Sequence, residues 1–425
     1  MTDRANWRPS QFFKRLGPGL ITGAADDDPS GIGTHSQIGA QFGYDLAWTF
    51  LFSFPLMVVI QEVAAEIGCV TGSGIARNLR RHYPRYILWL MVSLLLVANI
   101  VNLGADLSAM GAALALLAGG NAAFYTLGFG IVCVVVEVVL SYPRYSSVLK
   151  WTTLSLFTYV AVVMVAGVPW GHALTSLVVP NLQWNAAYIT AIVAILGTTI
   201  SPYLFFWQAG QEVEEQHRLR GKPLCMTPRT AGPELARIRL DTLVGMAFSS
   251  IISLAIVFAT AATLNAHGIT DIATSAQAAE ALRPIAGQFA FALFALGIIG
   301  TGMLAVPVLA GSAAYAVTEM VGVSGSLNAK LLDARLFYGT IAVTTLLGGM
   351  LNFVGIDPAR ALYWAAVVNG VLAAPLMAVM MLIARNPHAM GRLTLSRRAT
   401  ILGWIATLVM GVASLVFFAF TLGLA

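Results

Sequence analysis

The chain is dominated by apolar stretches of about 20 residues or more, each long enough to cross a hydrocarbon core of about 30 Å as a helix. A helix satisfies its backbone hydrogen bonds within one segment, as the membrane interior requires. We predict eleven spans, at approximately residues 16–40, 44–70, 86–118, 121–141, 148–168, 187–212, 239–265, 286–320, 335–353, 359–384 and 399–421. The sequence therefore predicts an all-α, multi-pass membrane protein with one continuous domain over residues 1–425.

Composition excludes a soluble protein. Hydrophobic residues make up 58% of the chain and charged residues only 10%, whereas charged residues form about 25% of an average soluble domain. The first ten residues are polar and contain Arg4 and Arg8, and no small-residue cleavage site follows the first apolar stretch. A removable signal peptide is therefore not expected.

The basic residues predict an orientation. If the N-terminus lies in the cytoplasm, every Lys and Arg falls in a cytoplasmic segment except Arg283 and Arg360. This bias is typical of multi-pass proteins, so the net charge of +5 reflects topology and no nucleic-acid partner is expected. We expect a multi-pass protein of the cell membrane, which in a bacterium is the inner membrane.

Two of the predicted spans contain residues that interrupt a helix. The first carries DPSG at residues 28–31, and the sixth carries TTISP at residues 198–202. Proline lacks a backbone donor, and glycine favours non-helical backbone. Unwound backbone is tolerated at membrane depth only where it is buried in protein or lines a wet cavity, so both segments are predicted to lie inside the bundle.

The spacing of the two breaks predicts the architecture. The first and sixth spans lie five spans apart, and because five is odd, two five-helix units would enter the membrane in opposite directions. Inverted repeats of this kind are common in secondary transporters, which bind their substrate at the midplane beside the broken helices. We predict repeats over about 16–168 and 187–384, followed by an extra helix at 399–421.

Three acids precede the first break, at Asp26, Asp27 and Asp28. Asp28 lies twelve residues after Leu16, roughly 18 Å along a helix, which is too deep for a short side chain to reach the headgroups. Each acid at that depth costs about 2.5–3.5 kcal/mol, so a functional gain is expected. A carboxylate beside free carbonyls suits a hard cation such as Mg²⁺, Ca²⁺ or Mn²⁺, whereas the carboxylate of an amino acid would be repelled.

At these residues the chain resembles the Nramp family of divalent-metal transporters, which have a LeuT-like fold. The family's first broken helix reads Asp-Pro-Gly-Asn, where this chain has DPSG at 28–31, and its sixth helix carries Ala-x-x-Met-Pro-His, where this chain has TTISPY at 198–203. NLGADLSAMGAAL at 102–114, VLKWTTLSL at 148–156 and ALYWAAVVNG at 361–370 extend the resemblance over most of the chain.

The resemblance implies a ligand set and two departures from it. Carried onto this chain, the family's metal ligands become Asp28, Gly31, the carbonyl of Thr198, and Ser201. The family's asparagine is thus replaced by glycine and its methionine by serine, which removes a soft thioether that favours transition metals. The space left suits water, which Mg²⁺ usually retains. The chain therefore looks most like the Nramp-related magnesium transporters (NRMT), a branch that takes Mg²⁺ and Mn²⁺.

Proton coupling is expected to be weak or absent. Tyr203 replaces the family's helix 6 histidine, and a phenol titrates near about 10; Asn99 and Ala109 stand where acids are common. Asp106 is retained, as part of a pathway or as a structural residue bonded to Asn102 or a neighbouring helix. The residues expected to surround the ion without binding it directly, or to line its pathway, are Asp27, Asp106, Tyr203, Asn369 and Glu212.

Glu62 and Glu66, one turn apart in the second span, are expected to be solvated or paired with Arg77. Two other functions stay open: a proton-coupled Mn²⁺ or Fe²⁺ transporter of the Nramp family, and a Na⁺-coupled symporter of organic solutes. An enzyme is not expected, because an intramembrane protease using Asp28 and Asp106 would carry a Gly-x-Gly-Asp signature that the chain lacks. We expect a monomer in the lipid bilayer that needs no cofactor apart from the transported ion.

Overall fold

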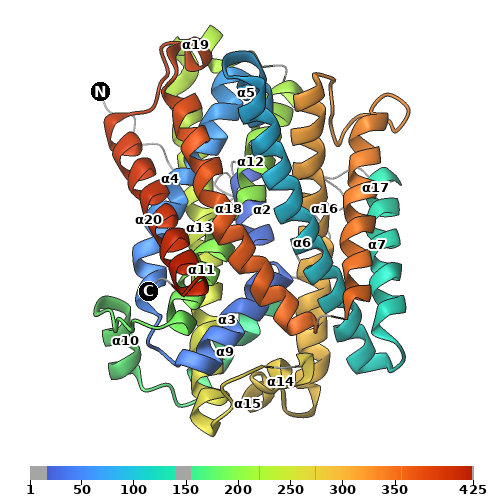
Figure 1. Ribbon diagram of the computed structural model, residues 1–425, viewed down its shortest axis with the longest axis vertical. Coiled ribbons are helices and arrows are strands. Elements are labelled where there is room, and N and C mark those ends of the chain that lie inside the picture. The colour runs from blue at the N-terminus through green and yellow to red at the C-terminus, as the bar shows by residue number, and fades with distance from the viewer. Residues whose placement is uncertain (1–16, 140–154, 220, 273, 356, 424–425) are drawn as a thin grey trace, which may run out of the picture.

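The computed structural model of this 425-residue chain describes residues 17–139, 155–219, 221–272, 274–355 and 357–423. Within these ranges the chain forms helices and no strand. The long helices run side by side along the long axis of the molecule, with the short helices α5 (Ile75–His82) and α19 (Pro387–Met390) at one end. The short helices α14 (Ser275–Glu280) and α15 (Arg283–Ala286) lie at the opposite end (Figure 1).

Nine helical stretches in the described ranges are long and apolar enough to cross a membrane, which agrees with nine of the predicted spans. Most of them are single helices, and one joins α11 and α12 across a break. The helices concerned are α4 (Trp48–Thr71), α6 (Arg85–Ala118), α7 (Ala122–Val139), α11 (Ala186–Thr199) with α12 (Pro202–Arg218), α13 (Ala231–Thr263), α16 (Ala290–Val321), α17 (Arg335–Met350), α18 (Pro358–Arg385) and α20 (Arg397–Thr421).

The other two predicted spans are described in shorter pieces. The first span forms two helices, α2 (Pro18–Asp26) and α3 (Pro29–Phe42). Of the fifth span, the structure describes α9 (Phe157–Val165), which is followed by the short helix α10 (Trp170–Val178). Most of the VLKWTTLSL segment and the basic residues of the first sixteen positions lie outside the described residues.

The first break lies earlier than the sequence predicted. We expected unwound backbone over 28–31, but only Asp27 and Asp28 lie between α2 and α3, and Gly31 is helical. The reason is that proline is tolerated at the first position of a helix, where no internal bond needs its missing N–H. Pro29 takes that position and Asp28 caps the helix, so this motif begins a helix rather than interrupting one.

The second break is equally short. α11 continues through Thr199 and α12 begins at Pro202, so only Ile200 and Ser201 lie between them. Thr198 and Thr199 are helical, whereas we expected them to be part of the interruption. The Thr199 hydroxyl donates to the carbonyl of Ile195 one turn earlier, at 2.8 Å, so this polar side chain is satisfied within the helix.

Small residues hold both broken helices close to their neighbours. α2 packs on α13 at Gly23, where a Cβ atom would lie 2.2 Å from the carbonyl oxygen of Gly245. α11 packs on α18 in the same way, since a Cβ on Gly197 would lie 2.0 Å from the carbonyl oxygen of Ala366. α12 packs on α4. Close backbone approach of this kind is common between membrane helices, and it fixes the two breaks within the bundle.

Candidate functional site

The Asp28 carboxylate is held in place by donors from both broken helices. Its Oδ1 accepts from the backbone N–H of Gly31 at 2.6 Å, and its Oδ2 accepts from the hydroxyl of Tyr203 on α12 at 3.2 Å. The side chain is 2% exposed, and no ion pair to it occurs among the described residues. Asp28 is therefore a buried, oriented carboxylate that lacks a protein cation.

Gly31 lies where α3 meets α11. A Cβ atom there would lie 3.3 Å from Thr198 Oγ1, 3.3 Å from the carbonyl oxygen of Asp26 and 3.4 Å from Asp28 Oδ1. The glycine is helical and not among the residues of positive φ, so its role at this point is to leave space. The structure thus brings Asp28, Gly31 and Thr198 together.

The two prolines each release a carbonyl. In a helix the carbonyl of residue i accepts from the N–H of residue i+4, but Pro202 and Pro29 have no N–H. The carbonyl of Thr198 therefore lacks its helical donor and accepts instead from the hydroxyl of Ser201 at 3.0 Å. The carbonyl oxygen of Ala25 lies 3.1 Å from the hydroxyl of Tyr203, which can donate its one proton either to this carbonyl or to Asp28 at a time.

Ser201 completes this junction. Its hydroxyl lies 3.0 Å from the carbonyl oxygens of both Gly197 and Thr198 and can donate its single proton to only one of them at a time. The lone pairs of its Oγ stay available. The two breaks therefore offer carboxylate, carbonyl and hydroxyl oxygens, which are ligand types that suit a hard cation.

Two further predicted residues lie beside the junction. Asp106 on α6 accepts from the backbone N–H of Ser30 at 3.1 Å, so it is bonded to a neighbouring helix and not to Asn102. Its Oδ2 is buried without a partner among the described residues. Asn369 is buried on α18, next to the close contact of Gly370 with Gly197. Its Oδ1 also has no hydrogen-bond partner among the residues that the structure describes.

Asp26 and Asp27 contact α13 at the hydroxyl groups of two serines. Ser249 Oγ lies 2.6 Å from Asp26 Oδ2 and 3.2 Å from Asp27 Oδ1, and Ser253 Oγ lies 3.5 Å from Asp27 Oδ1. Both acids are buried. The sequence analysis did not single out the serines, although their spacing of four residues within an apolar helix places them on one face and could have identified them.

The start of α2 is held by one carboxylate on α13. Asp241 accepts from the backbone N–H groups of Gly17, Gly19 and Leu20 at 3.0, 2.8 and 3.1 Å. These are amides of the first helical turn, which have no internal partner. Thr22 on the same helix bonds Gln208 on α12, so α2 is tied to both α13 and α12.

We expect Asp241→Ala to lower the thermal stability of the purified protein. Three amides would lose their acceptor, and a buried donor without a partner costs about 1–3 kcal/mol. Asp241→Asn keeps one acceptor oxygen and should lie between alanine and the original chain. The melting temperature in detergent measures this, and an unchanged value for Asp241→Ala would show that α2 is not held by this residue.

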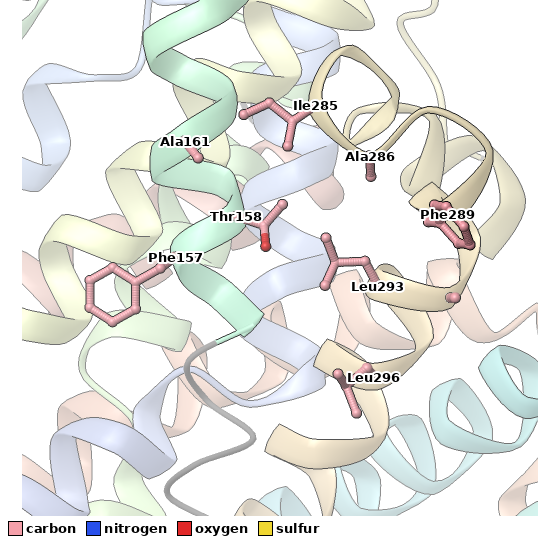
Figure 2. A pocket seen from close by; sticks show the side chains of 9 residues that line it. Phe157, Thr158, Ala161, Ile285, Ala286, Phe289, Leu293 and Leu296 are labelled. Atoms are coloured by element: carbon pink, nitrogen blue, oxygen red, sulfur yellow. The ribbon is translucent and has the colours of Figure 1, made fainter.

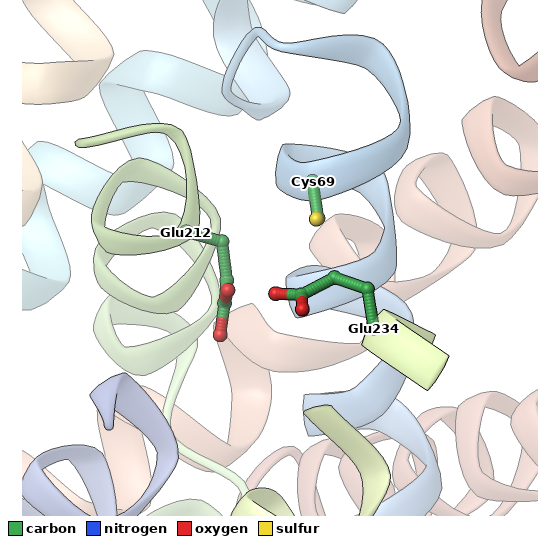
Figure 3. Close-up of side chains that lie close together, drawn as sticks. All are labelled: Cys69, Glu212 and Glu234. Carbon is green, nitrogen blue, oxygen red and sulfur yellow. The ribbon is translucent and has the colours of Figure 1, made fainter. Parts of the chain in front are cut away.

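Glu212 is buried and ion-paired, and its place along a pathway stays a prediction. It is 1% exposed and accepts from Arg237 Nη2 at 2.8 Å, and the same guanidinium bonds Glu234 at 2.8 Å through Nε. Figure 3 shows the side chains of Cys69, Glu212 and Glu234 close together, and one ligand atom of each lies within 4.8 Å of the others. Because Arg237 pairs with both carboxylates, the group forms an ion-pair network that joins α12 to α13.

Glu66 pairs with Arg239 on α13 at 3.1 Å, and the expected pairing with Arg77 is wrong. The side chain of Arg77 instead donates to the carbonyl of Val323 at 3.0 Å. Arg77 lies after the loop that ends α4, whereas α13 runs alongside α4. The nearer partner in space is thus much farther away in sequence.

A separate cavity of about 590 Å³ opens between α9 and the segment of α15 and α16 (Figure 2). Apolar side chains such as Phe157, Phe289 and Leu293 line it, and Thr158 supplies the hydroxyl seen in the figure. None of its lining residues is titratable. This cavity has no donor set for an ion and lies apart from the junction.

The broken helices, the buried junction and the surrounding bundle define a multi-pass membrane protein of LeuT-like fold. The structure matches the Eremococcus coleocola manganese transporter with a TM-score of 0.76 and 14% identity, covering 99% of this chain and 88% of that one. It also matches Mhp1, described as a nucleobase-cation-symport-1 family transporter, with a TM-score of 0.58 and 14% identity over 96% of this chain and 93% of that one. At these identities the likeness shows the fold alone.

Within that class, the chain belongs to the Nramp family. Residues 19–420 match the family described as natural resistance-associated macrophage protein-like. The resemblance drawn from the DPSG and TTISPY segments is therefore confirmed at the level of the family.

Curated relatives agree with this assignment. A Klebsiella pneumoniae protein described as the divalent metal cation transporter MntH is 25% identical over 398 residues, which cover 92% of this chain and 90% of the relative. A protein of the same description from Chromohalobacter salexigens is 27% identical over 335 residues, covering 70% and 67%. These relatives are described as transporters, which agrees with the expectation that this chain is not an enzyme.

Proposed function

We propose that this protein carries divalent metal cations, Mg²⁺ and Mn²⁺, across the membrane by alternating access. The ion would bind at the junction of the two broken helices, to Asp28, the carbonyl of Thr198 and Ser201, with Gly31 leaving room for water. The observation that carries the proposal is the Asp28 carboxylate, which is buried, oriented from both helices and without a cationic partner among the residues that the structure describes. Relatives described as divalent metal cation transporters support it.

The donor set favours hard ions. The groups that meet at the junction offer oxygen atoms, and Ser201 stands where the family carries a thioether. Mg²⁺ is bound by oxygen ligands and keeps several of its waters, whereas a thioether favours transition metals. This chemistry supports placing the chain in the NRMT branch. A manganese transporter as a structural neighbour keeps Mn²⁺ among the proposed substrates.

The surroundings of the junction support weak or absent proton coupling. Tyr203 uses its hydroxyl to bond Asp28 and the carbonyl of Ala25, and a phenol titrates near about 10. Asn99 donates through Nδ2 to the carbonyl of Leu309 at 2.9 Å and to Ser312 at 2.7 Å. An amide that joins α6 to α16 in this way does not carry a proton.

We expect metal uptake to move few or no protons. In proteoliposomes that contain a pH-sensitive dye, addition of Mn²⁺ or Mg²⁺ should cause an acidification much smaller than the metal flux. Liposomes without protein serve as the control for leak. A proton flux comparable with the metal flux would contradict this proposal and favour the proton-coupled Mn²⁺ or Fe²⁺ transporter.

The remaining expectations become part of the proposal. The bundle would consist of two inverted repeats over about 16–168 and 187–384, with α20 as an added helix, and the chain would act as a monomer. The N-terminus would face the cytoplasm, where most of the basic residues gather, and bacterial relatives support the inner membrane. Rocking of one unit against the other around a fixed site is the usual basis of alternating access.

Uptake assays test the proposed function. Proteoliposomes loaded with a metal-sensitive dye should respond to external Mg²⁺ and Mn²⁺, and liposomes without protein should not. The same vesicles should take up no radiolabelled amino acid in a Na⁺ gradient. Solute uptake that depends on Na⁺, without any response to metal, would replace this proposal with the organic-solute symporter.

A further inference from the structure

We propose that Asp26, Asp27, Ser249 and Ser253 form a second divalent-cation site, beside the junction and on the side of α13. The proposal rests on the proposed function, because it adds a step to the path of the same ion. The four side chains come from the end of α2, from the first break and from one face of α13. The serines belong to α13, whereas the other half of the junction comes from α11 and α12.

The two carboxylates share a neighbour, the hydroxyl of Ser249. Ser249 Oγ lies within hydrogen-bond distance of Asp26 Oδ2 at 2.6 Å and of Asp27 Oδ1 at 3.2 Å. Ser253 Oγ lies 3.5 Å from the same oxygen of Asp27. The Ser249 hydroxyl thus lies between the two carboxylates, so one ion at this point would be near both of them.

The hydrogen bonds available do not satisfy these acids. A serine hydroxyl donates one proton, so Ser249 cannot donate to both carboxylates at once. Asp26 Oδ1 and Asp27 Oδ2 are buried and have no partner among the described residues, although the acids are only 4% and 2% exposed. An unpaired buried acceptor is costly, so these two oxygens indicate a missing ligand.

The buried carboxylates around the first break also lack a cationic partner within the described ranges. Asp26, Asp27, Asp28 and Asp106 are buried around the first break, and in the described part of the chain no Lys, Arg or His forms an ion pair with any of them. Buried charges in proteins are normally paired or bound to metal. With all four carboxylates ionised, one divalent ion at Asp28 would leave half of their negative charge unbalanced, and a second divalent ion would balance it.

The ligand chemistry fits a hard divalent ion. Carboxylate and hydroxyl oxygens suit Mg²⁺, Ca²⁺ and Mn²⁺, and the four side chains offer only such oxygens. Since Asp27 precedes Asp28 directly, an ion bound here would lie next to the junction. Binding at two neighbouring sites favours release, because each ion repels the other. The second site would therefore help the ion to leave the junction.

Counting bound Mn²⁺ ions tests the proposal. Equilibrium dialysis of the purified full-length protein in detergent should give two Mn²⁺ per chain. Asp26→Asn/Asp27→Asn should bind one, and Asp28→Asn should also bind one. Asp333→Asn, which changes an exposed acid, is the matched control and should still bind two.

The outcomes separate this inference from the proposed function. If the original chain binds one Mn²⁺, which Asp26→Asn/Asp27→Asn keeps and Asp28→Asn loses, the second site does not exist and the junction stands. If Asp28→Asn binds as many ions as the original chain, the proposed function fails at its central residue. Two bound ions in Asp26→Asn/Asp27→Asn would place the second ion elsewhere and overturn the inference.

The serines provide a test that does not depend on the acids. If Asp26→Asn/Asp27→Asn does not fold, Ser249→Ala/Ser253→Ala should weaken the second Mn²⁺ about tenfold or more, as loss of groups around a metal commonly does. Ser250→Ala, the neighbouring serine on another face of α13, should leave both affinities unchanged. Unchanged affinity in Ser249→Ala/Ser253→Ala would overturn the inference.

Discussion

Replacing Asp28 with alanine or asparagine is expected to abolish uptake of Mg²⁺ and Mn²⁺ by proteoliposomes. The ion would lose the one carboxylate that both broken helices orient. Loss of a group that merely supports a metal ligand costs about 10–100-fold, so loss of the ligand itself should reduce uptake at least a hundredfold.

The two substitutions separate charge from structure. Asp28 caps α3 by accepting from Gly31, and asparagine caps a helix about as well as aspartate, whereas alanine costs about 0.5–2 kcal/mol. Asp28→Asn should therefore fold and melt like the original chain but fail to transport, while Asp28→Ala should also melt somewhat earlier. Asp333→Asn should transport normally. Uptake at the original rate by correctly folded Asp28→Asn would move the ion site elsewhere.

Restoring the family's ligands should reverse the preference between metals. In the double variant Gly31→Asn/Ser201→Met, a side-chain oxygen and a soft sulfur return to the junction, which favours Mn²⁺ over Mg²⁺. The new side chains also fill space that a hydrated Mg²⁺ would use. Excess Mg²⁺ should inhibit Mn²⁺ uptake strongly in the original chain and weakly in the double variant.

The structure identifies the difficulty in this experiment and its controls. Gly31 is helical, so asparagine fits the backbone, but its Cβ would lie 3.3 Å from Thr198 Oγ1 and must displace it slightly. Gly31→Ala introduces the same crowding without a ligand, and Ser201→Leu introduces similar volume without sulfur. Neither control should change the competition. Equal inhibition by Mg²⁺ in the original chain and the folded double variant would show that these positions do not set selectivity.

Much of the fold could be predicted because apolar length and proline chemistry act locally. A stretch of 20 apolar residues forms a span wherever it stands. Pro29 and Pro202 mark the two breaks because they lack the backbone N–H that an unbroken helix needs, and Asp28 marks the first because its side chain caps the helix that follows. The predicted extent of the breaks was wrong for a local reason too, since Asp28 with Pro29 is also a helix start. The ligand set drawn from the resemblance stays a prediction.

The pairings between distant segments could not be predicted. Glu66 pairs with Arg239, and Glu212 pairs with Arg237. Both arginines lie in the charged first turns of α13, which begins at Ala231 and packs along α4. The sequence analysis began that span only at residue 239, since those turns are polar. The serines that face Asp26 and Asp27 became visible only with the packing of α2 on α13.

Anomalous diffraction from crystals of the protein grown with Mn²⁺ would test the central claim most directly, because it locates the ion without reference to its effect on transport. The account predicts a manganese peak at the junction of the broken helices, coordinated by the Asp28 carboxylate and the carbonyl of Thr198 directly or through one water. A well-occupied manganese peak elsewhere, with none beside Asp28, would contradict it.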